Sequence, residues 1–135
     1  TAMSAIANGG TLMRPHIVRA IYNPDGSLYE DRQPQEVHKT LQPPVNRTLT
    51  GLLEQVVAEG GGAKAAVKGY RIAGKTGTSE NSQGRDHGWF VAYGPYVNPN
   101  IVVAVIVEQG GYGSVSAVPI GRKILEAAFG LDRTQ

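Results

Sequence analysis

The run Ile101 to Val107 is apolar at every position, and it restricts the possible folds more than any other stretch of the chain. A short run of this kind, rich in β-branched residues, predicts a buried strand. Trp89 to Tyr93 is a second aromatic and β-branched stretch, and the turn signal at residues 98–100 lies between the two. Residues 70–79 are also compatible with an extended backbone. Three consecutive strands joined by loops predict an antiparallel sheet.

Two helices are predicted before this sheet. Residues 2–7 have the composition of the last turns of a helix, which the glycines of residues 8–10 then end. From Val45 to Val57, apolar residues recur at the spacing of one helical face, and the glycines at residues 60–62 end the run. Asn46 is the candidate N-cap of this second helix.

A third helix is predicted after the sheet. It begins at Ser114 or Ser116, tolerates Pro119 in its first turn and ends at Gly130. Its predicted buried stripe consists of Val118, Ile124, Leu125 and Ala128.

The segment between the first two helices is polar and rich in turn residues. Ile17 to Tyr22 predicts a strand, the Asn-Pro-Asp-Gly sequence at residues 23–26 predicts a tight turn, and residues 27–29 predict the returning strand. Residues 37–41 predict a further short extended piece. The expected fold class is therefore α/β, more narrowly α+β, with an antiparallel sheet and flanking helices.

Composition excludes several kinds of protein. A chain of 135 residues with a net charge of +2 fits one domain, and without a long basic run it offers no support for nucleic-acid binding. There is no cysteine, so disulfides and thiolate metal sites are excluded. His16, His38 and His87 are too far apart in the sequence for any local metal-ligand spacing. No apolar run is long enough for a transmembrane helix.

Two different chemistries compete for the stretch that ends in Lys75 and Thr76. Residues 69–76 fit the phosphate-loop pattern G-x-x-x-x-G-K-[ST], and pattern rarity alone favours nucleotide binding. A phosphate loop, however, follows a buried strand and leads directly into a helix. Here the pattern is followed by Gly77 and a polar loop, and neither condition is met.

The alternative is that residues 75–78, Lys-Thr-Gly-Thr, lie in an extended strand. Lys75 would then attract a substrate carboxylate and favour deprotonation of a neighbouring nucleophile. The hydroxyl groups of Thr76 and Thr78 could bind the same carboxylate, and Gly77 would let a ligand approach the backbone. The backbone amide of Thr78 could serve as one donor of an oxyanion hole.

These residues and their surroundings resemble the last third of a penicillin-binding protein transpeptidase domain, a member of the penicillin-recognising serine acyl-enzymes. The likeness includes residues 72–79, the preceding helix with its glycine stop, residues 88–95 and residues 101–109. It covers essentially the whole chain. Residues 98–111 are more similar to the monofunctional, elongation-type members of class B than to the bifunctional members.

The resemblance implies a peptidoglycan D,D-transpeptidase that cross-links stem peptides ending in D-Ala-D-Ala through a serine acyl-enzyme and binds β-lactams. Carboxypeptidases, β-lactamases and β-lactam sensors of the same superfamily are the alternatives, and a phosphate-loop nucleotide-binding domain is a remote one. Lys75 and Thr78 are the implied catalytic residues, and Thr76 and Gly77 complete the implied substrate-binding set. No cofactor or metal is implied.

The nucleophile of this family is missing from the chain. No serine is followed by lysine three positions later, and Ser79-Glu80-Asn81 matches the family's Ser-x-Asn element only by coincidence, because it lies after the lysine strand. Residues 1–135 are therefore expected to be the C-terminal portion of one transpeptidase domain, inactive alone. The expected partners are stem peptides, β-lactams, the remaining N-terminal part of the domain, possibly as a second chain, and the cell-wall elongation machinery. The implied location is the extracytoplasmic face of the cell membrane, with the anchor outside this sequence.

Overall fold

A computed structural model describes residues 1–131 of the chain. The described helices and strands, in chain order, are α1 (Ala2–Ala7), β1 (Thr11–Met13), β2 (Ala20–Tyr22), β3 (Leu28–Asp31), β4 (Glu36–Lys39), α2 (Pro43–Ala58), the 3-10 helix η1 (Ala63–Ala65), β5 (Ala73–Ser79), β6 (His87–Gly94), β7 (Ile101–Val107) and α3 (Gly113–Ala128).

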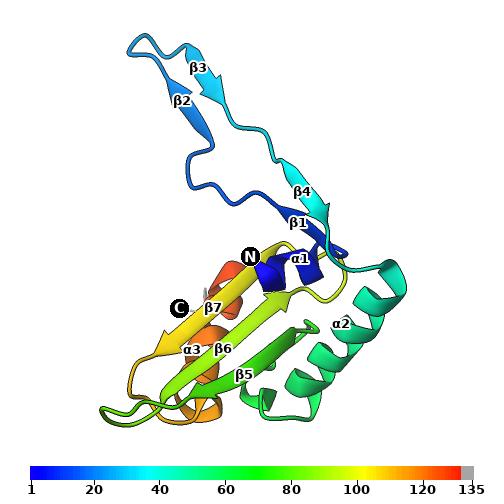
Figure 1. Cartoon of the computed structure of the whole chain (residues 1–135), viewed down its shortest axis with the longest axis vertical. Coiled ribbons are helices and arrows are strands. Elements are labelled where there is room, and N and C mark those ends of the chain that lie inside the picture. The colour runs from blue at the N-terminus through cyan, green and yellow to red at the C-terminus, as the bar shows by residue number, and fades with distance from the viewer. Residues whose placement is uncertain (132–135) are drawn as a thin grey trace.

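The central sheet has the strand order β5-β6-β7, and both pairs are antiparallel (Figure 1). The apolar run from Ile101 to Val107 forms β7 with the predicted bounds. Phe90 of β6 pairs with Thr76 of β5 on one side and with Val105 of β7 on the other, which fixes the register across the sheet. The predicted antiparallel sheet is confirmed.

Helix α3 covers one face of this sheet. Phe90 and Ala92 of β6 are fully buried against Val118 and Leu125 of the helix, and Val105 belongs to the same apolar cluster. Burying a large apolar side chain of this kind stabilises a fold by about 1.5–3 kcal/mol. This layer of helix on sheet is therefore the main core of the described residues.

The predicted stripe of α3 is only half right. Val118 and Leu125 are buried, whereas Ile124 is 41% exposed and Ala128 is also exposed. Small residues take the remaining contact positions: a Cβ on Gly121 would lie 2.5 Å from the Phe90 ring. The sequence pattern favoured large apolar residues, but the close approach of the helix requires glycine and alanine on this face.

The start of α3 also differs from the prediction. The helix begins at Gly113, so Ser116 lies inside it and its hydroxyl group donates a hydrogen bond to the carbonyl oxygen of Tyr112. Pro119 lies beyond the first turn. It has no N–H group to donate to the carbonyl of Val115, and that residue is exposed. Gly130 adopts a positive φ of 74° just after the helix, as its predicted role requires.

The opposite face of the sheet is covered only at one end. There Leu53 of α2 packs with Ala73 and Tyr93, and Met3 and Ile6 of α1 lie against this group. Beyond it, the sheet face carries exposed Trp89, Ala104 and Ile106. Part of the sheet is therefore without a covering layer in the described residues.

Asn46 does not cap α2, which corrects the prediction. The helix begins at Pro43 after the N-cap residue Gln42, since proline is tolerated in the first turn. Asn46 lies inside the helix, is 8% exposed, and donates from Nδ2 to the carbonyl oxygen of Ile6 at 3.1 Å. It links α2 to α1.

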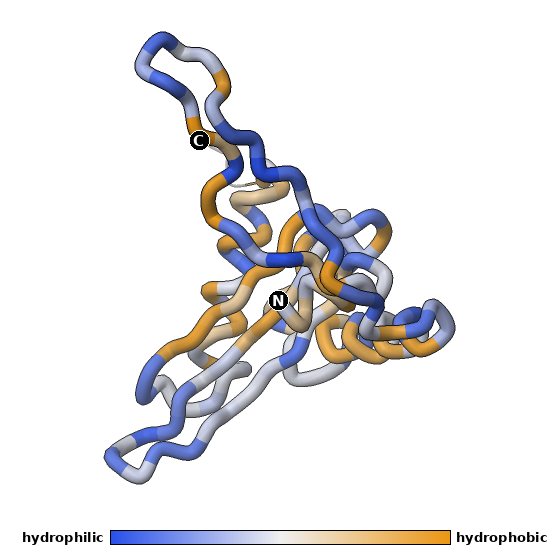
Figure 2. The backbone as a smooth tube through the Cα atoms, turned by 45° about the horizontal axis from the view of Figure 1, so that its top comes forward, coloured by the Kyte–Doolittle hydropathy of each residue, from blue (hydrophilic) through white to orange (hydrophobic). Residues whose placement is uncertain are grey.

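Residues 11–40 form an extended arm that leaves the body between α1 and α2 (Figure 1). Two separate antiparallel pairs, β1 with β4 and β2 with β3, build this arm. The predicted hairpin is confirmed, but its first strand begins at Ala20, because Ile17 and Val18 form no ladder and are exposed. Figure 2 shows polar residues along much of the arm, whereas apolar residues dominate β7.

Candidate functional site

The four residues from Lys75 to Thr78 lie within β5, an extended strand that continues to Ser79. This geometry rules out a phosphate loop, which would curve around an anion and lead directly into a helix. The next element after β5 is strand β6. The predicted extended backbone at positions 75–78 is confirmed.

Alternation along β5 separates the predicted site residues. Lys75 pairs with Val91, and Gly77 pairs with Trp89, on the face opposite α3. Thr76 pairs with Phe90, which is buried beneath α3, so the hydroxyl groups of Thr76 and Thr78 start from the other face. The side chains of Lys75 and the two threonines can meet one ligand only at the outer edge of β5. In residues 1–131, no strand pairs with that edge.

Lys75 is exposed, and its ammonium group donates a hydrogen bond to the carbonyl oxygen of Thr76 at 2.7 Å. Within the described part of the chain, no carboxylate forms an ion pair with it. A contact to a neighbouring carbonyl at the surface is easily exchanged for a contact to an anion. The cation is therefore available to a ligand at the strand edge.

Trp89 has no catalytic role predicted from the sequence, but it lies beside the site. Its indole Nε1 donates to the hydroxyl oxygen of Ser79 at 2.6 Å, and the residue is 38% exposed. A Cβ on Gly77 would lie 3.3 Å from the Cβ of Trp89. Because Gly77 has no side chain, the sheet face beside Trp89 stays open at this position. The register of the sheet places Trp89 beside Gly77, on the face opposite to the one that buries Phe90.

Ser79 and Asn81 of the Ser-x-Asn match form hydrogen bonds with nearby residues. Ser79 accepts the hydrogen bond from Trp89. Asn81 accepts from the backbone N–H of Gln83 at 3.0 Å and donates to the carbonyl of Arg85 at 3.3 Å, which shapes the loop between β5 and β6. The interpretation of this match as a coincidence remains a prediction.

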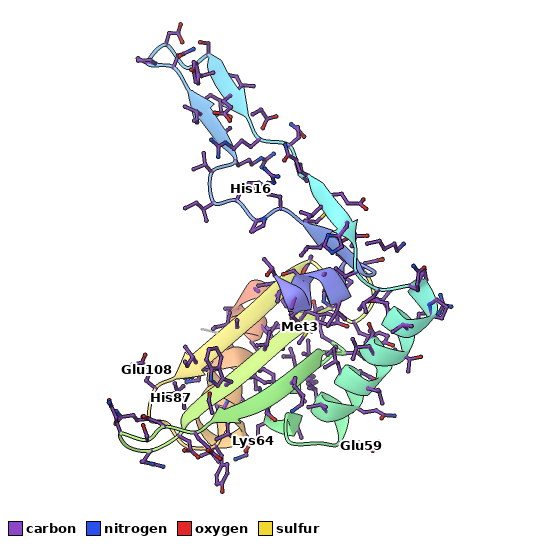
Figure 3. All side chains as sticks on the ribbon, in the orientation of Figure 1. Met3, His16, Glu59, Lys64, His87 and Glu108 are labelled. Carbon is purple, nitrogen blue, oxygen red and sulfur yellow. The ribbon has the colours of Figure 1, made fainter. Side chains whose placement is uncertain are left out.

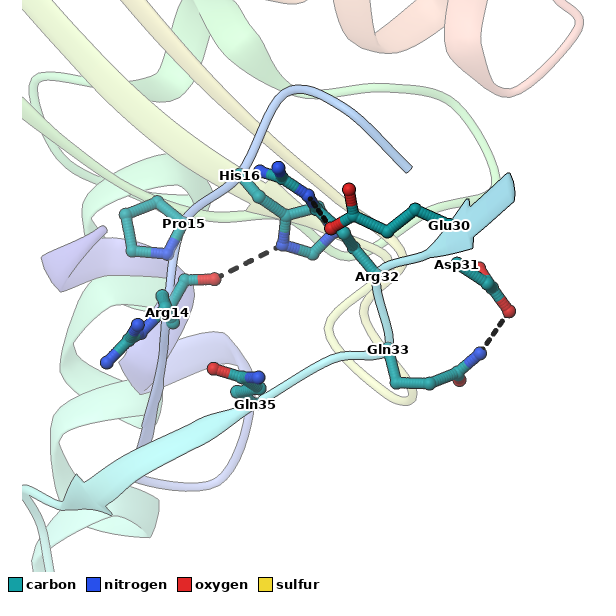
Figure 4. Close-up of a pocket in the computed structure, with 8 residues that line it drawn as sticks. All are labelled: Arg14, Pro15, His16, Glu30, Asp31, Arg32, Gln33 and Gln35. Atoms are coloured by element: carbon teal, nitrogen blue, oxygen red, sulfur yellow. Dashed lines mark hydrogen bonds and ion pairs between the residues drawn. The ribbon is translucent and has the colours of Figure 1, made fainter. Parts of the chain in front are cut away.

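A pocket of about 410 Å³ lies in the arm rather than beside Lys75. Figure 4 shows it at the widening between the two strand pairs, where the side chains of His16, Glu30 and Arg32 lie together and the side chain of Arg14 points away from them. Arg32 is already paired with Glu30 at 2.8 Å, with both side chains largely exposed. An internally paired, solvated set of charges of this kind gives little net attraction for a charged ligand.

Histidine and acidic side chains do not gather anywhere in the described residues in a group of three or more that could hold a metal ion. Figure 3 shows His16 in the arm and His87 at the loop end of the sheet, near Glu108. His87 instead accepts a hydrogen bond at Nδ1 from the backbone N–H of Gln109 at 2.9 Å. Within residues 1–131, no helix has the length and apolar character needed to cross a bilayer.

Comparison with known proteins establishes the family. The profile of the penicillin-binding protein transpeptidase domain matches residues 1–126, so this chain belongs to that family. It is 37% identical to the peptidoglycan D,D-transpeptidase PbpA of Mycolicibacterium smegmatis, over 93% of this chain and 27% of that protein. It is 34% identical to the peptidoglycan D,D-transpeptidase MrdA of Haemophilus influenzae, over 93% of this chain and 22% of that protein.

Solved structures show the same relationship. Penicillin-binding protein A from Mycobacterium tuberculosis, in its ceftriaxone acyl-enzyme complex, superposes with a TM-score of 0.86 and is 34% identical over 93% of this chain and 30% of that one. The expected fold class and the class B family are confirmed. The chain spans less than a third of the length of each of these proteins. The individual roles given to Lys75, Thr76, Gly77 and Thr78 remain predictions.

Proposed function

We propose that this chain forms the Lys75 side of the active site of a peptidoglycan D,D-transpeptidase. The observation that supports the proposal is the extended, unpaired outer edge of β5 beside an available lysine ammonium group. The relatives named above are D,D-transpeptidases, and one was solved as an acyl-enzyme with a β-lactam.

The substrate would lie along the edge of β5, as an added strand lies beside an exposed sheet edge. A stem peptide ending in D-Ala-D-Ala carries a carboxylate that Lys75 can attract. Thr76 and Thr78 can contribute hydroxyl groups from the other face only at this same edge. The edge position therefore reconciles the predicted roles with the alternation of the strand.

The backbone amide of Thr78 is proposed as one donor of the oxyanion hole. A preorganised donor of this type contributes about 3–4 kcal/mol to transition-state stabilisation. Gly77, next to it, leaves room for the substrate to approach the backbone.

The serine nucleophile would come from polypeptide outside these residues. The exposed apolar part of the sheet face, with Trp89, Ala104 and Ile106, supports this proposal, because patches of this kind normally contact another surface. The remainder of the transpeptidase domain is the natural occupant. The complete protein would act at the extracytoplasmic face of the membrane with the elongation machinery, and residues 1–135 alone would not be acylated.

The test is acylation of the complete protein that contains this chain by a fluorescent penicillin. Lys75→Met should lower the acylation rate about 100-fold or more, since it removes the cation that assists the nucleophile and the substrate. Lys64→Met removes an exposed lysine of η1 and should leave the rate unchanged. Wild-type acylation in Lys75→Met would refute the proposed site. Product analysis with a stem peptide and an acceptor amine then separates cross-linking from hydrolysis.

A further inference from the structure

His87, the first residue of β6, holds the turn that follows β7. Figure 3 shows it at the end of the sheet where β6 begins and β7 ends. Its ring nitrogen Nδ1 accepts a hydrogen bond from the backbone N–H of Gln109 at 2.9 Å, so a neutral imidazole here carries its proton on Nε2. Gln109 has a φ of 52°, which is uncommon for residues other than glycine. A backbone conformation of this kind persists only where neighbouring contacts hold it, and the bond to His87 is such a contact.

A second hydrogen bond ties the same connection to the start of β6. The backbone N–H of Gly111 donates to the carbonyl oxygen of Asp86 at 2.8 Å. Residues 108–112 form the whole connection between β7 and α3, so it is held at two consecutive residues, 86 and 87. The place where α3 begins therefore depends on these bonds.

The first residue of α3 lies against the backbone of the candidate site. A Cβ on Gly113 would overlap the carbonyl oxygens of Gly77 and Trp89 and would lie 2.9 Å from the backbone nitrogen of Trp89. Since Gly77 and Trp89 are partners in the β5-β6 ladder, Gly113 lies over the bonds between the two strands. The carbonyl group of Gly77 is therefore turned toward β6.

The adjacent pair in the ladder has the same support. Gly88 pairs with Thr78, and a Cβ on Gly88 would lie 2.9 Å from the carbonyl oxygen of Gly111 and 3.1 Å from the Cα of Gly113. The end of the β7-α3 connection thus lies directly on the backbone of both pairs. No side chain separates the connection from the strands at these positions.

The carbonyl of Gly77 and the N–H of Thr78 belong to one planar, trans peptide group, so they point in opposite directions. With the carbonyl turned toward β6, the N–H is turned toward the outer edge of β5. Any rotation of the carbonyl turns the N–H by the same angle. The contact of Gly113 on this carbonyl therefore sets the direction of the N–H that is proposed above as an oxyanion-hole donor.

We infer that His87 is a positioning residue for the backbone N–H of Thr78. By holding Gln109, it keeps the β7-α3 connection and Gly113 in place, and Gly113 in turn keeps the Gly77–Thr78 peptide in one orientation. A donor of this kind assists the reaction because its direction is fixed before the negative charge develops. The inference rests on the proposed function and extends it from the strand edge to a residue outside the predicted site.

The test uses the complete protein and two substitutions of one residue. His87→Phe keeps a ring but removes the acceptor, whereas His87→Asn keeps an acceptor oxygen close to the position of Nδ1. Rapid mixing with a fluorescent penicillin separates the dissociation constant of the initial complex from the rate constant of acylation. His87→Phe should lower the rate constant about tenfold, less than the roughly 100-fold effect of losing an oxyanion donor altogether. The dissociation constant should stay the same, and His87→Asn should restore most of the rate constant.

A purely structural role would give a different result. Lower stability alone reduces the amount of folded protein, which melting temperatures report, but it leaves the rate constant of the folded fraction unchanged. His38→Phe, in the exposed strand β4 of the arm, is the matched control and should change neither constant. If His87→Phe does not fold, His87→Ala carries the same prediction.

Three results would overturn the role of His87: a wild-type rate constant in His87→Phe, an equally slow His87→Asn, or a weaker initial complex with an unchanged rate constant. The variant Lys75→Met distinguishes this failure from failure of the proposed function. Normal acylation in Lys75→Met would refute the proposed site and this inference with it. A defect in Lys75→Met but not in His87→Phe would overturn the inference alone.

Discussion

Gly113, the first residue of α3, lies directly against the carbonyl oxygen of Gly77 in β5, so that a Cβ on Gly113 would overlap that oxygen. The same Cβ would also overlap the carbonyl oxygen of Trp89. Both obstacles are backbone atoms of paired strands, which cannot move independently. The end of the helix is therefore seated on the backbone beneath the predicted substrate edge.

Gly113→Ala should consequently destabilise the fold by about 1–3 kcal/mol or more, as overpacking does. Gly51→Ala is the matched control, because a Cβ at Gly51 of α2 has no neighbour within 4 Å. That substitution should be neutral or stabilise by up to about 1 kcal/mol, through the helix propensity of alanine. Thermal unfolding of the complete protein compares the two, and equal melting temperatures would contradict the packing described above.

Leu125→Ala should destabilise by about 2–5 kcal/mol, since it leaves a cavity under a fully buried side chain. Ile124→Ala removes a similar side chain from the preceding position of α3, where it is 41% exposed. This substitution should lower the stability by less than about 1 kcal/mol. Denaturant unfolding measures both. Similar losses of stability in the two variants would mean that Ile124 is buried as well, as the sequence pattern predicted.

The hydrogen bond from Trp89 to Ser79 should be measurable by a double-mutant cycle. Trp89→Phe and Ser79→Ala each remove it, and the coupling free energy between them should be about 0.5–1.5 kcal/mol. A coupling of zero would mean that the bond contributes nothing to stability in solution. Acylation rates of the same variants show whether the bond also positions the edge of β5.

The ion pair between Arg71 and Glu54, at 2.8 Å, predicts a pH dependence of stability. The hydrogen bond from Arg71 lowers the pKa of Glu54 below its ordinary value of 4.5. The folded state therefore gains stability above that value, and the gain is lost as the pH falls through the lower pKa of the folded protein. Arg71 also stacks on Tyr96, 4.0 Å from the ring centroid, which keeps its guanidinium in place.

Glu54→Gln should therefore lower the melting temperature at pH 7, and the difference from wild type should shrink progressively below pH 4.5. Glu59→Gln removes the same charge from an exposed residue that forms no ion pair in residues 1–131, and it should show no such trend. A Glu54→Gln difference that persists unchanged into acid would exclude the ion pair as its cause.

The sheet could be predicted because its strands have strong local patterns. The run that forms β7 and the aromatic stretch in β6 are apolar enough to be recognised as strands from the sequence alone. The glycines after α2 likewise mark the end of that helix. Strand β1 was missed, because Thr11–Met13 is too short to show alternation and is extended only through its pairing with β4. The exposure of Ile124 was missed for a similar reason: which face of α3 is buried depends on where glycines allow close contact.

The sequence identified which residues belong to the candidate site, but not how these residues are arranged in space. Lys75 and Thr78 could be selected from their order in the sequence. Their placement on opposite faces of β5, the proximity of Trp89 and the support from Gly113 depend on register and on contacts between distant segments. A single sequence does not specify these.

The arm closes at its own base, where the carbonyl oxygen of Gly10 accepts hydrogen bonds from the backbone N–H and the hydroxyl group of Thr40, at 2.7 Å and 2.9 Å. The two chain segments that enter the body are thereby held at a fixed spacing, whatever lies beyond them. Insertions, deletions or an exchanged hairpin in this region would leave β5 undisturbed. A change of length or sequence in the arm would therefore not move the strand that carries Lys75.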